Sequence, residues 1–262
     1  MIMKSEELGL PIFYQQYPEY FDTPSNIYYT NEKNAVIEKL LNTYGVRTVL
    51  DMACGTGAQV LYLAKLGYEI SGSDFSPGLL EIAREKALEQ GTNAQFINGD
   101  MRTLQMGKFD AVITIDNAIG HLVKGDFGLA IRNIHKNLKQ DGIYIFDILN
   151  LDEMTDEVVK SDSERMTDRR VTSDGTIIDN TRYSTIDRNN GHLTSENNFT
   201  IQKGGEQKKV KNKCTLQIYT MDELRNILSK NGFQLIEQYK MNAYTFQKDD
   251  LGYSIMTVAQ KV

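Results

Sequence analysis

The spacing of hydrophobic residues changes sharply near residue 50 of this chain. Val49 and Leu50 form an apolar run that ends at Asp51, and a loop of small residues follows at positions 53–57. Apolar residues then recur at helical spacing, at positions 60, 61, 63, 64 and 66. This pattern predicts a buried strand, a tight glycine turn and a helix, which together are the first unit of a doubly wound α/β sheet.

The order of strand and acidic residue repeats downstream. Strands are predicted at residues 68–73, 94–97 and 109–115, and the acidic residues that close them are Asp74, Asp100 and Asp116. The carboxyl ends of parallel strands meet at one edge of such a sheet, and ligands bind at that edge. Because carboxylates accept hydrogen bonds and repel phosphates, these acidic strand ends indicate a ligand rich in hydroxyl and amino donors.

The alternation of strands and helices stops between residues 151 and 216. An acidic helical stretch is followed by strand-like runs at 182–187, 192–201 and 210–219. Asn190-Gly191 separates the first two runs, and Asn-Gly between alternating segments is a strong hairpin signal. The pattern predicts a small antiparallel sheet inserted after the fifth core strand. A helix near 222–231 and strands near 233–240 and 253–260 then complete the core.

The glycine loop departs from two common nucleotide-binding motifs. A dinucleotide fingerprint needs Gly or Ala where Val60 stands, and the Gly-Lys-Ser/Thr of a P-loop is absent from the sequence. Asp51 beside the turn would repel a pyrophosphate and attract an amine. The loop therefore argues against a nicotinamide dehydrogenase and against a P-loop nucleotidase.

Composition narrows the class of protein further. The chain has 262 residues, of which 40% are hydrophobic, enough for one large domain or for a core with an inserted subdomain. Its net charge of −6 argues against a nucleic-acid substrate, because Lys and Arg carry phosphate affinity. The two cysteines lack metal-ligand spacing, so we expect no metal and a reducing, cytoplasmic location. No apolar run is long enough to span a bilayer, so we expect no membrane association.

Taken together, the segments resemble the class I S-adenosylmethionine-dependent methyltransferases. Motif I of that family is similar to VLDMACGTG, motif II to SGSDFSPGLLEIAR and motif III to NGDMRTL, while the later core strand is similar to LKQDGIYIFDI. In layout the chain is nearest to small-molecule amine N-methyltransferases. The resemblance implies methyl transfer from S-adenosyl-L-methionine to a small polar molecule, at N or O, by in-line displacement. The product of the cofactor would be S-adenosyl-L-homocysteine.

The resemblance also assigns the cofactor contacts. Asp51 would face the methionine amino group, Asp74 would accept both ribose hydroxyls, and Asp100 would accept from the adenine amine. The other cofactor-binding candidates are backbone, apolar or methyl-bordering residues: Ala53, Cys54, Gly55, Gly57, Phe75, Met101 and Asp116. A strand-end Asp also has a structural alternative, as the cap of the following helix.

The acceptor side is assigned less directly. Asn117 and His121 follow the fourth strand, where they would orient the acceptor or take its proton, with loop packing as the alternative. Acceptor-binding candidates elsewhere are Tyr14, Tyr17 and Arg182. A magnesium site of the catechol methyltransferase kind would use Asp116, Asp147 and Asn150, but each of these has another use, so no metal is assigned.

The expected fold is α/β, a doubly wound, mostly parallel seven-stranded Rossmann-like sheet with an inserted small antiparallel β-sheet. The expected parts are an aromatic-rich N-terminal lid (1–30), the cofactor-binding methyltransferase core (31–150), the antiparallel substrate cap (151–216) and the C-terminal part of the core (217–262). A helix is expected to begin near Asn31. The cap could instead pair two copies into a homodimer through its sheet edges. The functional alternative is a non-catalytic protein that binds S-adenosylmethionine or serves in assembly, because fold alone does not settle function.

Overall fold

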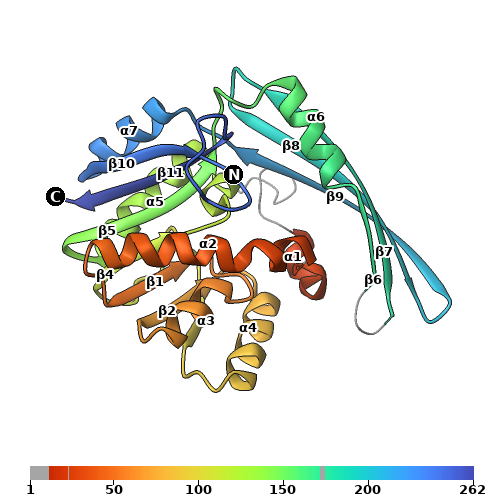
Figure 1. Ribbon diagram of the computed structural model, residues 1–262, viewed down its shortest axis with the longest axis horizontal. Helices are drawn as coiled ribbons and strands as arrows, with labels where there is room; N and C mark the ends of the chain where they lie inside the picture. Colours follow the sequence, from red (N-terminus) through yellow and green to blue (C-terminus); the bar gives the residue numbers. More distant parts are fainter. Residues whose placement is uncertain (1–11, 23, 172–174) are drawn as a thin grey trace.

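The computed structural model describes residues 12–22, 24–171 and 175–262. Two sheets dominate the molecule, one of seven strands and one of four (Figure 1). Their topology confirms the expected α/β class with an inserted antiparallel sheet. Residues 1–11 of the expected N-terminal lid lie outside the described residues. None of the helices in the described ranges combines the length and apolar character needed to cross a bilayer.

The seven-stranded sheet has the order β10-β11-β5-β4-β1-β2-β3. Its strands are β1 (Thr48–Met52), β2 (Glu69–Asp74), β3 (Gln95–Asn98), β4 (Phe109–Thr114), β5 (Leu138–Leu149), β10 (Phe233–Met241) and β11 (Ser254–Lys261). β1 pairs in parallel with both β2 and β4, and only β11 runs antiparallel to its neighbours β5 and β10. The order in which successive strands are added to the sheet reverses between β1 and β4. Sheets of this kind bind ligands at that point.

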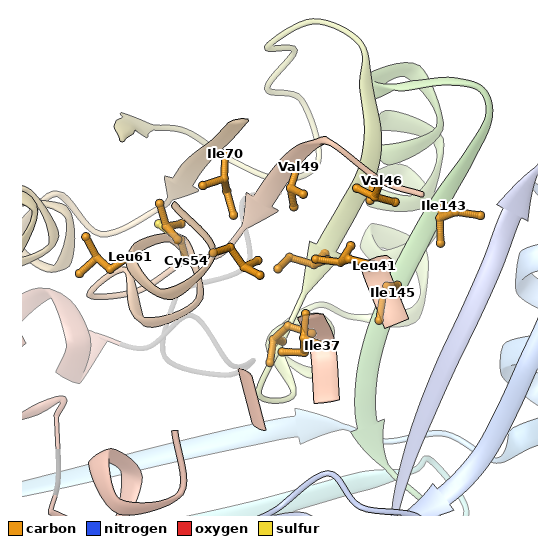
Figure 2. Packing of buried hydrophobic residues seen from close by; sticks show 14 of the residues in the cluster. Ile37, Leu41, Val46, Val49, Cys54, Leu61, Ile70, Ile143 and Ile145 are labelled. Carbon is orange, nitrogen blue, oxygen red and sulfur yellow. The ribbon is translucent and has the colours of Figure 1, made fainter. Parts of the chain in front are cut away.

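Helices cover both faces of this sheet. They are α2 (Pro24–Thr43), α3 (Ala58–Lys65), α4 (Pro77–Glu89), α5 (Lys124–Asn137) and α7 (Met221–Lys230). Figure 2 shows Ile37 and Leu41 of α2, both fully buried, packed with Val49 of β1 and Ile145 of β5. Burying each of these side chains stabilises the fold by roughly 1.5–3 kcal/mol. The i, i+4 spacing of Ile37 and Leu41 thus fixes α2 across the strands that carry the glycine loop.

The expectation that this helix begins near Asn31 is wrong. α2 begins at Pro24, seven residues earlier, and reaches back into the segment expected to be a lid. Proline fits the first helical position, because its fixed φ matches the helix and that position needs no N–H donor. The earlier start places Lys33 in the first half of a continuous helix, the half that borders the cavity at the carboxyl edge of the sheet.

The four-stranded antiparallel sheet has the order β6-β7-β8-β9. Its strands are β6 (Asp168–Val171), β7 (Ile177–Asp187), β8 (His192–Lys203) and β9 (Glu206–Gln217), and α6 (Asp156–Arg165) precedes them. Gly191 has a φ of +67° in the turn between β7 and β8, as the Asn-Gly signal predicts. Asp187 supports that turn by accepting hydrogen bonds from the N–H groups of Asn189 and Asn190.

This second sheet lies beyond the carboxyl ends of the parallel strands (Figure 1). A β-bridge between Asn150 and Tyr219 joins the two ends of the insert to the core. At the same edge, α1 (Ile12–Gln16) and η1 (Pro18–Tyr20) pack against α4, and Ser76 donates its hydroxyl proton to the Tyr14 carbonyl at 3.1 Å. The N-terminal helices and the insert therefore meet over one edge of the core.

Gly57 offers a stability test of the glycine loop. Its φ is +85°, and an added Cβ would lie 3.0 Å from the Phe96 ring and 3.2 Å from the Ala83 Cβ. Gly57→Ala should therefore combine left-handed strain with overpacking and destabilise the protein by roughly 2–4 kcal/mol. Gly67 is the matched control, because its φ is +89° and nothing lies within 4 Å of an added Cβ. Denaturant unfolding should show a loss of only about 1 kcal/mol for Gly67→Ala, and equal losses for both variants would contradict the packing account.

Candidate functional site

A cavity of about 370 Å³ opens at the carboxyl edge of the seven-stranded sheet. One part of its wall comes from the loops that follow β1, β2, β3 and β4. Another part comes from α1, α2 and the residues after η1, and the last comes from α6, the antiparallel sheet and residues 243–253. Described residues of the core, the N-terminal segment, the inserted sheet and the C-terminal part of the chain therefore all border this cavity.

Most of the predicted site residues line this cavity. The lining includes Ala53, Cys54, Gly55, Asp74, Phe75, Asp100, Met101, Asp116, Asn117, His121, Tyr14 and Arg182. Asp51, Gly57 and Tyr17 are not part of the lining. Gly57 faces the Phe96 ring, and Tyr17 packs against Ile178, Phe199 and Ile201 of the second sheet. For these two residues the structure shows packing contacts, and their ligand contacts stay predictions.

Asp74 joins two loops at the end of β2. Its Oδ2 accepts the N–H of Gly55, and its Oδ1 accepts the N–H of Ser76, both at 2.8 Å. Burial raises the pKa of this carboxyl, although the backbone hydrogen bonds oppose the shift. Ser76, not Asp74, is the N-cap of α4, since its hydroxyl accepts from the Leu79 N–H. Asp74 therefore keeps lone pairs for a ligand while it holds the glycine loop in place.

Asp51 lies beneath the cavity wall at the end of β1. The residue is 1% exposed, and its Oδ2 has no hydrogen-bond partner among the described residues. Burial raises its pKa well above the usual range, and the charges of Asp74 and Asp116 raise it further. A buried, unpaired carboxylate oxygen among other carboxylates attracts a cationic donor. This feature fits the amino group of a ligand and does not fit a phosphate.

Asp100 forms an ion pair that the sequence analysis missed. Arg102 donates through Nε to both carboxylate oxygens, at 3.0 and 2.9 Å, and through Nη1 to Asp126 at 2.6 Å. Burial opposes ionisation of Asp100, but the hydrogen bonds from Arg102 outweigh it and the pKa of Asp100 is lowered. The ion pair could have been expected from the sequence, because Asp100 and Arg102 are only two residues apart. A ligand contact by Asp100 would have to share its oxygens with this guanidinium.

The turn after β4 carries the residues nearest the expected methyl group. Asp116 and Asn117 have φ values of +61° and +60°, which is strained for residues that are not glycine, by roughly 1–2 kcal/mol each. Their N–H groups donate to the buried Asp147 of β5, at 2.6 and 3.2 Å. Lys33 of α2 reaches the turn and forms an ion pair with Asp116. Lys33 has no local signal in the sequence, because it lies 83 residues from its partner.

The same contacts bear on the magnesium alternative. Both oxygens of Asp147 accept backbone N–H groups, and Asn150 Oδ1 accepts the N–H of Asp152 at 3.2 Å. A cation needs those lone pairs directed toward it. Among the described residues, no group of three His, Cys, Asp or Glu is arranged to hold a metal ion. Asp147 and Asn150 thus accept backbone N–H groups in two different turns.

The far end of the cavity holds a second polar cluster. Tyr244 donates its hydroxyl proton to Asp162 of α6 at 3.0 Å, and the Arg182 guanidinium lies 3.9 Å from the same carboxylate. Arg182 is held by Ser195, to which its Nη2 donates at 2.8 Å. Sequence reasoning named Arg182 but missed Asp162 on α6 and the two tyrosines of the segment between β10 and β11, Tyr244 and Tyr253.

His121 lies between the two ends of the cavity. It closes η2 (Ala118–His121), and its Nδ1 is 3.9 Å from the Sγ of Cys214 on β9. Its ring meets that of Tyr14 edge-on, with the centroids 6.1 Å apart. Burial raises the pKa of Cys214 to about 11 and that of Cys54 well above its ordinary value. Both thiols therefore stay protonated at neutral pH, and neither is suited to be a nucleophile.

Comparisons with known proteins agree with this geometry. Residues 49–142 match a family described as a methyltransferase domain. A glycine/sarcosine N-methyltransferase of Aphanothece halophytica is 28% identical over 226 residues, which cover 83% of this chain and 77% of that protein. Other curated relatives are matched over about half of their length, for example 57% and 43%.

Solved structures share the fold over nearly the whole chain. An S-adenosylmethionine-dependent methyltransferase from Clostridium acetobutylicum aligns with a TM-score of 0.70 at 15% identity, covering 95% of this chain and 96% of that one. CalS10 of Micromonospora echinaspora, an amino pentose methyltransferase solved with bound SAM, gives a TM-score of 0.68 at 18% identity and covers 98% and 99%. Residues 49–142 of this protein are therefore similar to a methyltransferase domain, and the chain has the fold of the S-adenosylmethionine-dependent methyltransferases.

Proposed function

We propose that this protein is an S-adenosylmethionine-dependent methyltransferase that methylates a small polar molecule. The observation that carries the proposal is one continuous cavity with two chemically different ends. Asp74, Gly55 and Met101 line the end where the family binds its cofactor. Asp162, Arg182 and Tyr244 line the other end, and the turn after β4 lies between them. Such a cavity can hold a cofactor and an acceptor at once.

The residues present fit the cofactor by their own chemistry. When bound, S-adenosylmethionine supplies a methyl group already activated by its sulfonium. Asp74 would accept the ribose hydroxyls, because its two oxygens keep acceptor capacity beyond the backbone N–H groups of Gly55 and Ser76. The unpaired oxygen of Asp51 fits the amino group of the methionine end. Phe75 and Met101 offer apolar surface for the adenine.

This chain's residues would then orient the acceptor and take its proton. Holding a lone pair in line with the reacting carbon supplies much of the rate in a transfer of this kind. An amine acceptor must also lose a proton, and Asp116 and His121 both line the middle of the cavity. The Asn117 side-chain oxygen is buried and has no hydrogen-bond partner among the described residues, so it can accept from an N–H or O–H of the acceptor.

An amine is the favoured acceptor. Asp116 and Asp162 place carboxylates at the middle and far end of the cavity, where they would attract a cationic or hydrogen-bonding nitrogen. The named relatives point the same way, since they include N-methyltransferases of glycine and sarcosine. A role for the antiparallel sheet in pairing two copies is a separate proposal that leaves the site unchanged.

A screen of acceptors tests the proposal. The purified protein would be incubated with S-adenosylmethionine and panels of amino acids, amino sugars, phenols and carboxylates, and S-adenosylhomocysteine would be measured. At least one amine should raise product well above the rate without acceptor. Cofactor binding without transfer to any member of the panel would instead favour the non-catalytic alternative.

A further inference from the structure

The turn after β4 depends on a contact that no part of the methyl-transfer scheme uses. Asp116 and Asn117 are consecutive residues in the left-handed region, and neither is glycine. Such backbone persists only where surrounding contacts fix it. Both residues line the cavity, so the conformation decides where their side chains point.

Asp147 supplies the fixing contact. It lies on β5, is 1% exposed, and receives the N–H of Asp116 on Oδ1 and the N–H of Asn117 on Oδ2. Two successive N–H groups that converge on one anion form a nest, a recognised anion-binding arrangement of the backbone. Here the anion is the Asp147 carboxylate of the chain itself, and its two hydrogen bonds fix the conformation of the turn.

The turn that Asp147 holds is continuous with η2. Asn117 is the N-cap of η2, and its carbonyl accepts the N–H of Gly120 at 2.9 Å. His121 is the last residue of that short helix. The backbone of the turn is therefore hydrogen-bonded to the short helix that carries His121.

Few charged groups face Asp147. Asp116 approaches Asp147 from the end of β4, and Lys33 approaches it from α2. On β5 itself, burial and the charge of Asp147 raise the pKa of Tyr144. Burial and the charge of Asp116 raise the pKa of Asp147, and Lys33 and the two N–H groups oppose that rise. Protonation would turn one of its oxygens into a hydroxyl donor and weaken the nest.

We propose that Asp147 is a positioning residue for methyl transfer, which fixes the Asp116-Asn117 turn and through it aims three cavity side chains at the acceptor. It touches neither cofactor nor acceptor and acts only through the backbone of the turn. The kinetic consequence rests on the proposed function, whereas the structural consequence does not.

Two variants separate positioning from mere stability. Asp147→Asn keeps the shape of the side chain but presents an amide NH₂ where an acceptor is needed. One N–H of the turn therefore loses its hydrogen-bond acceptor. Tyr144→Phe is the matched control, because it removes a buried 2.8 Å hydrogen bond to Thr114 between the same two strands. We expect Asp147→Asn to lower kcat by at least about tenfold while the Kd for S-adenosylmethionine changes by less than about threefold. Tyr144→Phe should keep kcat within about twofold of the unmodified protein.

Amide resonances give a second readout that needs no acceptor. In the unmodified protein the N–H signals of Asp116 and Asn117 should shift together as pH falls, with one common midpoint. Asp147→Asn should abolish that joint shift, and Tyr144→Phe should retain it. Equal kinetic losses in both variants, or amide signals that do not respond to Asp147→Asn, would overturn the proposal. If Asp147→Asn does not fold, the titration in the unmodified protein decides alone. If no acceptor is methylated, the proposed function fails and the amide signals still decide the nest.

Discussion

Asp74→Ala should lower the affinity for S-adenosylmethionine by about thirtyfold to a thousandfold. In the structure Asp74 holds the Gly55 N–H and the Ser76 N–H, and the resemblance gives it both ribose hydroxyls as well. Losing charge-assisted hydrogen bonds to a carboxylate costs roughly 2–4 kcal/mol, which corresponds to that range of affinity. Titration calorimetry on the variant measures the change directly.

Asp110→Ala is the matched control for this prediction. Asp110 also accepts backbone N–H groups, from Thr48 at 2.8 Å and Arg47 at 3.1 Å, but it lies near the opposite, amino-terminal edge of the sheet. Its loss should leave the cofactor affinity within about threefold. Unchanged affinity in a folded Asp74→Ala protein would remove Asp74 from the cofactor site.

The pH dependence of cofactor binding should follow the same carboxylate. Burial raises the pKa of Asp74, so the group takes up a proton at a higher pH than an exposed Asp does. The ionised form accepts the ribose hydroxyls, and the protonated form loses acceptor capacity. Affinity should therefore fall on acidification, beginning at a higher pH than an exposed Asp would give, and Asp74→Ala should lose most of that dependence.

Arg182→Ala should lower kcat/KM for the acceptor by roughly tenfold to a hundredfold, with little change in cofactor affinity. The guanidinium lies at the far end of the cavity, where its Nη2 donates a hydrogen bond to neutral Ser195 at 2.8 Å. The Asp162 carboxylate lies 3.9 Å away, beyond hydrogen-bond distance, so the guanidinium keeps N–H groups for an acceptor. Hydrogen bonds to charged groups contribute about 1.5–3 kcal/mol. Steady-state kinetics with the acceptor found in the screen, together with calorimetry on the cofactor, separate the two effects.

Arg188→Ala makes the same substitution in the same sheet, away from the cavity. Arg188 forms an ion pair with Asp156 at 2.8 Å near the β7–β8 turn, where the pair is exposed. Exposed pairs contribute little, so kcat/KM should stay within about twofold. If both arginine variants lose activity equally, or if Arg182→Ala weakens the cofactor as much as the acceptor, the far end of the cavity is not the acceptor site.

The strand ends and the hairpin were predictable because their signals are local. Asp74, Asp100 and Asp116 each follow a short apolar run, and Asn190-Gly191 selects a two-strand turn by its own conformational preference. The parallel arrangement then brings the strand ends to one edge without further information. That is why most of the predicted cofactor residues line one cavity.

The partners of those residues were not predictable in the same way. Lys33 and Asp147 meet at Asp116 from α2 and β5, and no spacing rule connects them. Asp162 and Tyr244 meet across 82 residues, on elements whose packing depends on the whole fold. Tyr17 could be recognised only as an amphipathic aromatic, and the structure shows that its ring packs on the second sheet.

Binding of S-adenosylmethionine to the unmodified protein tests the central claim most directly. Titration calorimetry should show one site per chain for S-adenosylmethionine and for S-adenosylhomocysteine, and no heat of binding for NAD under the same conditions. Binding of NAD, or the absence of binding by both S-adenosyl compounds to the folded protein, would contradict the account.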